Sequence, residues 1–227
     1  MNGNKGGINM SILSNIKDIF KPVLSDRTIM KYNKKGILIE GQLTPHQIQP
    51  NSVDLTLGNT YKILNYNSKD ENRLYRRLPD VNLIDPKNKI IYEEGVFKNG
   101  EYIIEPGEFV LMASNEVLNI PNGILSFVQG RSSIARLGIQ TEQAGLIDAG
   151  FKGTITFEVF NQTKYPIKLY EGMRIAQVYF FKAQKSLVPY GKLHKHSKYF
   201  TQSDATGSRI HMDPELKVIK NKEYDMK

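Results

Sequence analysis

Two arginines and two adjacent hydroxyl groups lie in one short segment, residues 130–138, with the sequence GRSSIARLG. A glycine-rich turn with the sequence AGLIDAGFKG follows at 144–153 and contains Asp148, and a lone glutamate, Glu158, comes after it. Guanidinium groups and free backbone amides bind phosphates, whereas carboxylates can contact a sugar or transfer protons at a base. This set of groups fits a nucleoside triphosphate as the ligand.

The arginine–serine segment predicts a short helix. Ser132 is placed to cap its start and Gly138 to end it, so that backbone N–H groups at the start would face a phosphate. Arg131 and Arg136 would add forked guanidinium donors. Taken alone, the segment fits a capped surface helix with two solvated arginines equally well.

The stretch 154–160, TITFEVF, alternates in the manner of a strand. A period of two places Ile155, Phe157 and Val159 on one face and Thr156 and Glu158 on the other. A carboxylate that shares a face with a hydroxyl in such an apolar strand suits a group that takes and returns protons. A solvent-facing glutamate is the alternative for this strand taken alone.

The chain contains no cysteine, which excludes thiolate nucleophiles, disulfides, iron–sulfur clusters and cysteine-based zinc sites. The zinc-dependent nucleobase deaminases hold their metal with cysteines and are therefore excluded too. The histidines have no HExxH spacing and lie at positions His46, His194, His196 and His211. We expect no zinc in this protein.

The formal net charge of +8 favours anionic partners. The lysines are scattered and no nucleic-acid-binding signature accompanies them, so a nucleotide is preferred over a nucleic acid. No apolar run approaches the roughly 20 residues that span a bilayer, and the start of the chain lacks the apolar region of a signal peptide. We expect a cytoplasmic protein with neither a nucleic acid nor a membrane as partner.

The elements that position these groups are expected to form one domain, residues 25–209. Residues 1–24 are expected to be a flexible extension, and residues 210–227 a charged tail. Ser25 and Gly36 bracket a predicted N-capped helix. The charged, asparagine-rich segment 66–100 is expected to form a loop or irregular hairpins around 83–84 and 90–92.

Short strands are predicted over most of the remaining domain, at 52–57, 102–104, 109–112, 124–128, 154–160, 167–169 and 175–181. Glycine, proline and asparagine separate them, which predicts a mainly β sandwich or barrel with few short helices. From Tyr190 onward the apolar content falls. That part is either a disordered tail or an arm that becomes ordered over a bound ligand.

Several blocks of the sequence, in this order, resemble the dCTP deaminase family of the dUTPase-like superfamily. They are QPNSVDL at 49–55, GRSSIARLG, AGLIDAGFKG, Glu158, GMRI at 172–175 and SKY at 197–199. The resemblance implies a distorted antiparallel β-barrel or jelly roll and a homotrimer whose subunits share active sites. It also implies zinc-free hydrolytic deamination of dCTP, with Mg²⁺ bound through the triphosphate.

The resemblance implies roles for individual residues. Glu158 matches the general acid/base that activates a water for attack at C4 and passes its proton to N3 and then to the leaving ammonia. Ser132 would orient that water together with the carbonyl of Ala144, and Arg136 would hold the glutamate in its charged form.

Other positions match substrate-binding residues of the family. They are Arg131 and Ser133 at the phosphates, Asp148 at the deoxyribose, Thr156 and Phe157 in the strand whose backbone contacts the base, and Tyr190, Lys198 and Gln202 in the C-terminal arm that closes over the triphosphate. Asp54 matches a position that assists metal binding in dUTPases, and we expect it to be structural here.

Two subtypes of the family differ in the three residues that precede the Ile-Asp pair, which is Ile147-Asp148 in this chain. Monofunctional deaminases carry Ala-His-Arg there, whereas dUMP-forming enzymes carry Ala-Gly-aromatic and a glutamine in the strand after Gly-Met. Residues 144–146 (AGL) and Gln177 resemble the dUMP-forming subtype, in which Asp148 would also orient the water that attacks the α-phosphate. Plain dUTPases have an apolar residue at the position of Glu158.

The chain departs from the family pattern at one loop. Gln143 stands where a threonine is usual, and the loop 138–144 is one residue shorter than in relatives, where it adjoins the base and mediates inhibition by dTTP. The alternatives are a monofunctional deaminase that releases dUTP, a non-catalytic nucleotide-binding relative and a nucleic-acid-binding protein.

Overall fold

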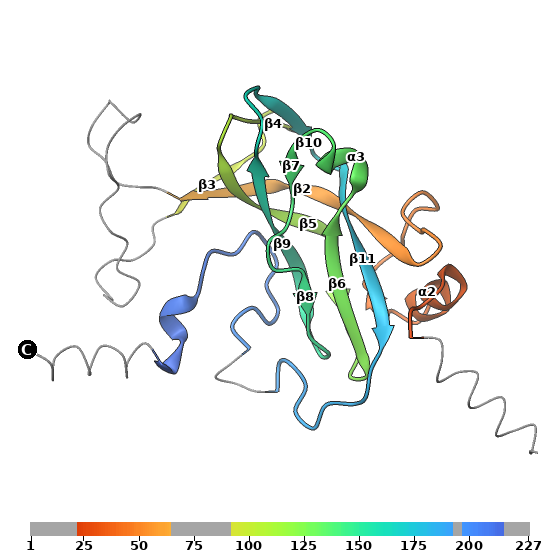
Figure 1. Cartoon of the computed structure of the whole chain (residues 1–227). Coiled ribbons are helices and arrows are strands. Elements are labelled where there is room, and N and C mark those ends of the chain that lie inside the picture. The colour runs from red at the N-terminus through yellow and green to blue at the C-terminus, as the bar shows by residue number, and fades with distance from the viewer. Residues whose placement is uncertain (1–21, 65–91, 193–196, 216–227) are drawn as a thin grey trace, which may run out of the picture.

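A curled antiparallel sheet makes up most of the molecule (Figure 1). The computed structural model describes residues 22–64, 92–192 and 197–215. Most of the predicted flexible extension, residues 1–21, and the predicted hairpins around 83–84 and 90–91 lie outside these residues, whereas residue 92 begins a strand.

The described elements have the following bounds. The strands are β1 (Leu38–Ile39), β2 (Ser52–Leu64), β3 (Tyr92–Val96), β4 (Glu101–Ile104), β5 (Phe109–Asn119), β6 (Ile124–Gly130), β7 (Ile139–Gln140), β8 (Leu146–Ile147), β9 (Lys152–Asn161), β10 (Ile167–Tyr170) and β11 (Arg174–Lys182). The helices are α2 (Asp26–Asn33), the single turn α3 (Ser132–Ala135) and the 3₁₀ turn η1 (Ile210–Met212).

The larger sheet has the strand order β7-β9-β5-β2-β11-β6-β8, and β1 pairs with β5 while β3 pairs with β2. β10 and β4 form a separate two-stranded sheet. Every pair of strands is antiparallel. The prediction of a mainly β, antiparallel barrel or jelly roll with few short helices is confirmed.

The core lies against the central strands of this sheet. Val53 and Leu55 of β2 and Phe157 and Val159 of β9 are fully buried. Burying a side chain of this size contributes about 1.5–3 kcal/mol. Glu158, next to them in β9, is only partly buried, so the two-residue alternation predicted for 154–160 is confirmed.

β2 and β5 extend furthest beyond the predicted strands 52–57 and 109–112, and both shift register along their length. β2 continues past residue 57 to Leu64, and its register with β5 shifts between Leu57 and Tyr61. Such irregularities bend a strand and increase its twist. The first part of β2 pairs with β11 and the last part with β3. The two-residue strands β1, β7 and β8 were not predicted, because two residues show no periodicity.

The two predicted helices exist, but one starts differently. Ser25 is the N-cap residue of α2, although its side chain makes no capping hydrogen bond, and Gly36 follows the helix with a positive φ of 67°. In α3 the N-cap is Arg131, whose backbone is extended, so the prediction that Ser132 caps this helix is wrong. Ser132 is already helical because the chain turns one residue earlier.

Both ends of the described chain pack on the domain. The backbone N–H of Leu24 donates to Phe180 O at 2.9 Å and Leu24 is 2% exposed, so the fold begins before residue 25. Asp213, within the predicted charged tail, pairs with Lys198. No helix in the described part of the chain is long and apolar enough to cross a membrane.

Candidate active site

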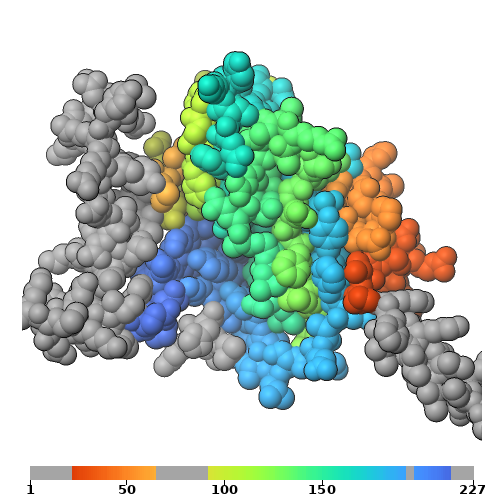
Figure 2. Space-filling model, in the orientation of Figure 1, coloured from red at the N-terminus to blue at the C-terminus, as the bar shows by residue number. Residues whose placement is uncertain are grey.

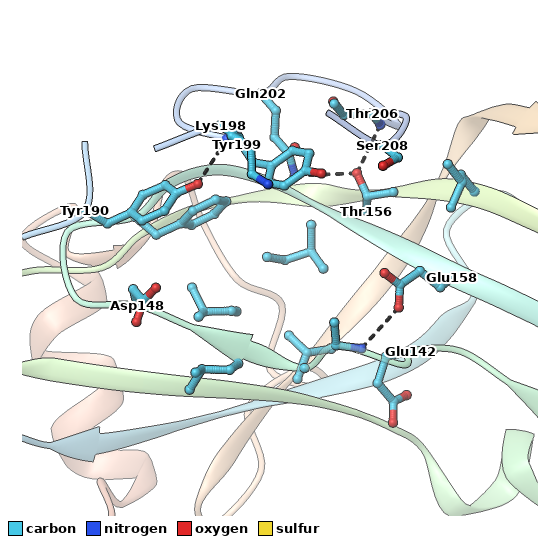
Figure 3. Close-up of a pocket in the computed structure, with 18 of the residues that line it drawn as sticks. Glu142, Asp148, Thr156, Glu158, Tyr190, Lys198, Tyr199, Gln202, Thr206 and Ser208 are labelled. Atoms are coloured by element: carbon cyan, nitrogen blue, oxygen red, sulfur yellow. Dashed lines mark hydrogen bonds between the residues drawn. The ribbon is translucent and has the colours of Figure 1, made fainter. Parts of the chain in front are cut away.

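A pocket of about 680 Å³ lies between the sheet and the arm formed by residues 197–209 (Figure 3). This volume is in the usual range for sites that bind small molecules. Its walls come from β5, β6, β8, β9, the segment 142–145, Tyr190 and the arm. Residues distant in the sequence therefore meet in one cavity.

Glu158 points into this pocket from β9 and is held by backbone amides. Its Oε2 accepts hydrogen bonds from the N–H of Gln143 at 2.7 Å and of Ala144 at 3.1 Å. Hydrogen bonds to an ionised carboxylate are stronger than neutral ones, so the side chain has a defined orientation. Within the described residues no hydrogen bond engages Oε1, which can therefore face a ligand or a water.

The segment that supplies these amides is packed tightly against β6. The N–H of Val128 donates to Gly145 O at 2.8 Å. A Cβ at Gly145 would lie 2.3 Å from Val128 O, so only glycine fits there. The same segment brings Glu142 to the pocket, where its carboxylate accepts a hydrogen bond from the Thr141 hydroxyl at 2.8 Å. We did not predict Glu142, since an isolated glutamate in a loop shows no periodic signal.

At the other end of the pocket, Asp148 lies near Tyr190 (Figure 3). The ring of Tyr190 packs on that of Phe151 with 5.9 Å between centroids, and its hydroxyl accepts from the N–H of Tyr199 at 3.0 Å. Burial raises the pKa of Tyr190, so its hydroxyl stays neutral at physiological pH. Tyr190 thereby connects the turn of Asp148 to the arm.

The arm is attached to β9 by paired hydrogen bonds. The backbone N–H of Thr154 donates to Gln202 O at 2.9 Å, and Gln202 Nε2 donates to Thr154 O at 2.7 Å. The N–H of Thr206 donates to the Thr156 hydroxyl at 3.0 Å. Figure 2 shows this blue segment packed against the strands of the sheet. The described part of this segment therefore packs on the sheet beside the pocket.

Among the described residues that line the pocket, three carboxylates face one cation. The carboxylates belong to Glu142, Asp148 and Glu158, and the cation is Lys198. Lys198 Nζ lies 2.7 Å from Asp213 Oδ1, and this hydrogen bond raises the pKa of Lys198. The wall of one chain therefore has little free positive charge for a phosphate group.

The predicted site residues fall into two groups. The pocket is lined by Ala144, Asp148, Thr156, Glu158, Tyr190, Lys198 and Gln202. Outside its lining lie Arg131, Ser132, Ser133, Arg136, Phe157 and Gln177. The Phe157 side chain is fully buried in the core, so only its backbone could contact a ligand. α3, with Ser132 and Ser133, lies near the top of the view in Figure 1, away from the arm.

Gln177 lies opposite Asp54 of β2 and Gln129 of β6 in the sheet, and Arg131 forms an ion pair with Asp54. Among the described residues of one chain, the groups that hold Glu158 are the amides of Gln143 and Ala144. Sequence reasoning did not predict the arm residues Thr206 and Ser208, because polar residues in a segment of low apolar content carry no local signal. Fold and pocket together define a mainly β protein with a cavity of the size of a small-molecule site, lined by the carboxylates of Glu142, Asp148 and Glu158.

The comparisons with known proteins agree with this class. The sequence model of the dCTP deaminase-like family matches residues 23–183. A protein of Sulfurihydrogenibium sp. named "dCTP deaminase, dUMP-forming" is 40% identical over 197 residues, which cover 84% of this chain and 98% of that protein. A protein of the same name from Aquifex aeolicus is 37% identical over 195 residues, with coverages of 86% and 98%.

Among solved structures, 2'-deoxycytidine 5'-triphosphate deaminase from Agrobacterium tumefaciens is similar, with a TM-score of 0.54 and 25% identity. The match covers 71% of this chain and 49% of the other, so the chain spans about half the length of that protein. The chain belongs to the dCTP deaminase-like family.

Proposed function

We propose that this protein is a hydrolase that deaminates dCTP and cleaves its triphosphate, giving dUMP, diphosphate and ammonia in the cytoplasm. The observation that carries the proposal is the carboxylate of Glu158, which two backbone amides hold in the pocket and whose other oxygen has no hydrogen bond from the described residues. The relatives named as dUMP-forming dCTP deaminases support the choice of substrate and product.

In the deamination step, Glu158 acts as general acid/base. Its carboxylate takes a proton from a water molecule as the oxygen of that water attacks C4, and it delivers this proton to N3. The remaining hydroxyl proton then passes through Glu158 to the amino group. Ammonia leaves, the C4 carbonyl forms and dUTP remains in the pocket.

In the second step, Asp148 orients a water that attacks the α-phosphate of dUTP. The bond between the α- and β-phosphates breaks, so the products are dUMP and diphosphate. Asp148 lines the same pocket as Glu158, which allows both steps without release of dUTP. The substrate enters as its magnesium complex, since Mg²⁺ in such sites is held by substrate phosphates with one or two carboxylates.

The charge of the pocket supports a site shared between copies of the chain. A triphosphate needs cations, and the described wall of one chain offers only Lys198, which is already paired with Asp213. Arg131, Ser132 and Arg136 lie outside the pocket of their own chain. We propose a homotrimer in which these residues of one subunit complete the pocket of the next.

The test is the product distribution from dCTP and Mg²⁺ with the purified protein. We expect dUMP, diphosphate and ammonia in equal amounts. Accumulation of dUTP without diphosphate would support the monofunctional alternative, and binding of dCTP without any product would support a non-catalytic relative. Inhibition by dTTP, measured in the same assay, tests whether the short loop at Gln143 still allows feedback.

A further inference from the structure

A carboxylate that the proposed mechanism does not use is buried between two arginines. Asp54, on β2, is 1% exposed. Its Oδ2 lies 3.3 Å from Nε of Arg131 and 3.0 Å from Nη1 of Arg174. Arg131 precedes α3 and Arg174 begins β11, so Asp54 joins three elements that are distant in the sequence.

Arg131 is held at several points. Besides its contact with Asp54, its Nη1 donates to the carbonyl of Arg174 at 3.1 Å, and its backbone N–H donates to Ile175 O at 3.0 Å. Within the described residues Nη2 has no protein partner. The Arg131 side chain is 27% exposed, so part of the guanidinium is anchored while another part is open to an incoming anion.

An arginine fixed in this way is organised in advance for binding a phosphate. A guanidinium offers planar, paired donors, and ordering a long side chain before binding lowers the entropic cost of association. Two arginines against one carboxylate also leave an excess of positive charge around Asp54. The arrangement therefore favours a further anion at Arg131.

A buried ion pair of this kind is weak evidence that the carboxylate is there for stability. Removing a carboxylate from water offsets much of the attraction between buried charges. Burial raises the pKa of Asp54, and the charges of Arg131 and Arg174 oppose this shift. A metal role for Asp54 does not fit either, because both arginines contact the same oxygen and the residue has almost no exposure.

We propose that Asp54 is a positioning residue for the reaction, which orients Arg131 so that its open side meets the triphosphate of the substrate. This inference rests on the proposed function, because it assumes that Arg131 completes a dCTP site. Asp54 itself touches no substrate. Its effect is carried entirely through the guanidinium of Arg131.

The test compares Asp54→Asn with a matched control, Glu116→Gln. Glu116 is also a carboxylate that accepts hydrogen bonds from residues near β2, namely from Thr56 N at 2.8 Å and from Gln47 Nε2 at 2.7 Å, but it contacts no arginine in the described structure. For both variants we would measure KM and kcat for dCTP and the inhibition constants of inorganic tripolyphosphate and of deoxycytidine.

Asp54→Asn should raise both the KM for dCTP and the inhibition constant of tripolyphosphate about tenfold, as expected for the loss of one well-oriented charged contact. Inhibition by deoxycytidine and kcat should change little. Glu116→Gln should lower the melting temperature and leave both inhibition constants unchanged. An unchanged tripolyphosphate constant in Asp54→Asn would overturn the inference, whereas a wild-type protein that neither converts nor binds dCTP would overturn the proposed function.

A crystal structure of the wild-type protein with tripolyphosphate and Mg²⁺ tests the inference even if Asp54→Asn does not fold. We expect a phosphate oxygen within hydrogen-bond distance of Arg131 while Asp54 still contacts Nε of that arginine. Mg²⁺ bound to Asp54, or an Arg131 that has left Asp54 to reach the phosphate, would contradict the proposal.

Discussion

Oε2 of Glu158 lies 2.7 Å from the backbone nitrogen of Gln143. Gln143 belongs to the loop 138–144, so this loop supplies the amides that orient the proposed acid/base. The Ala144 amide adds a second donor to the same oxygen. Changes in the loop should therefore act directly on the chemistry at Glu158.

Glu158→Gln should lower kcat for dCTP by about 10²–10⁴-fold, the range typical of a general acid/base, because an amide cannot take a proton from water. The measurement is ammonia release at saturating dCTP. Glu142→Gln is the matched control, since Glu142 lines the same pocket but is bonded to the Thr141 hydroxyl. Equal losses in the two variants would remove the special role of Glu158.

Gly153→Ala should detach the arm from β9. Gly153 has a φ of +145°, and a Cβ there would lie 2.7 Å from Gln202 O. We expect the KM for dCTP to rise several-fold and the arm to become sensitive to protease. Gly107→Ala is the control, because Gly107 also has a positive φ but no atom lies within 4 Å of its added Cβ. It should incur only backbone strain of about 1 kcal/mol, and an equal rise in KM would contradict the role of the arm.

Asp213→Asn should lower the KM for dCTP. Lys198 lines the pocket, and its amino group forms an ion pair with Asp213 that competes with binding of a substrate phosphate. The control is Glu101→Gln, which removes a comparable surface pair with Lys168 at 2.8 Å in the separate β4–β10 sheet. It should leave KM unchanged. A KM that rises in Asp213→Asn would show that Asp213 assists rather than competes with the substrate.

The same ion pair should make a small pH-dependent contribution to stability. Asp213 raises the pKa of Lys198, so the stabilisation is fully present below the ordinary lysine pKa of about 10.4 and is lost as the pH rises through the folded-state value. For a partly exposed pair it is at most about 1 kcal/mol. Melting temperatures of wild type and Asp213→Asn should differ slightly at pH 8 and converge only when the pH exceeds the raised folded-state pKa of Lys198.

Mixed oligomers should show whether the site is shared. Glu158→Gln and Arg136→Ala are each expected to be inactive, but co-expression with two different tags should restore part of the activity in the doubly tagged fraction. In a mixed oligomer, some sites would combine a wild-type Arg136 from the Glu158→Gln subunit with a wild-type Glu158 from the Arg136→Ala subunit. Doubly tagged oligomers without activity would contradict the shared site.

Several features of this protein could be predicted from the sequence because their signals are local. The alternation around Glu158 identified its strand and the face of its side chain, and Ser25 and Gly36 bracketed the helix Asp26–Asn33. The ordered blocks around Arg131 and Asp148 predicted the family that the comparisons show. Local signals did not fix the ends of elements: the N-cap of α3 is Arg131, one residue before the predicted Ser132.

Only the tertiary structure decided which of these groups meet. The amides of Gln143 and Ala144 reach Glu158, and Arg131 reaches Asp54, through the path of the curled sheet. Likewise the arm reaches β9 through Gln202. Periodicity reports the environment of a residue along its own element, whereas such contacts join residues far apart in the chain. They depend on strand order and register, which no single segment encodes.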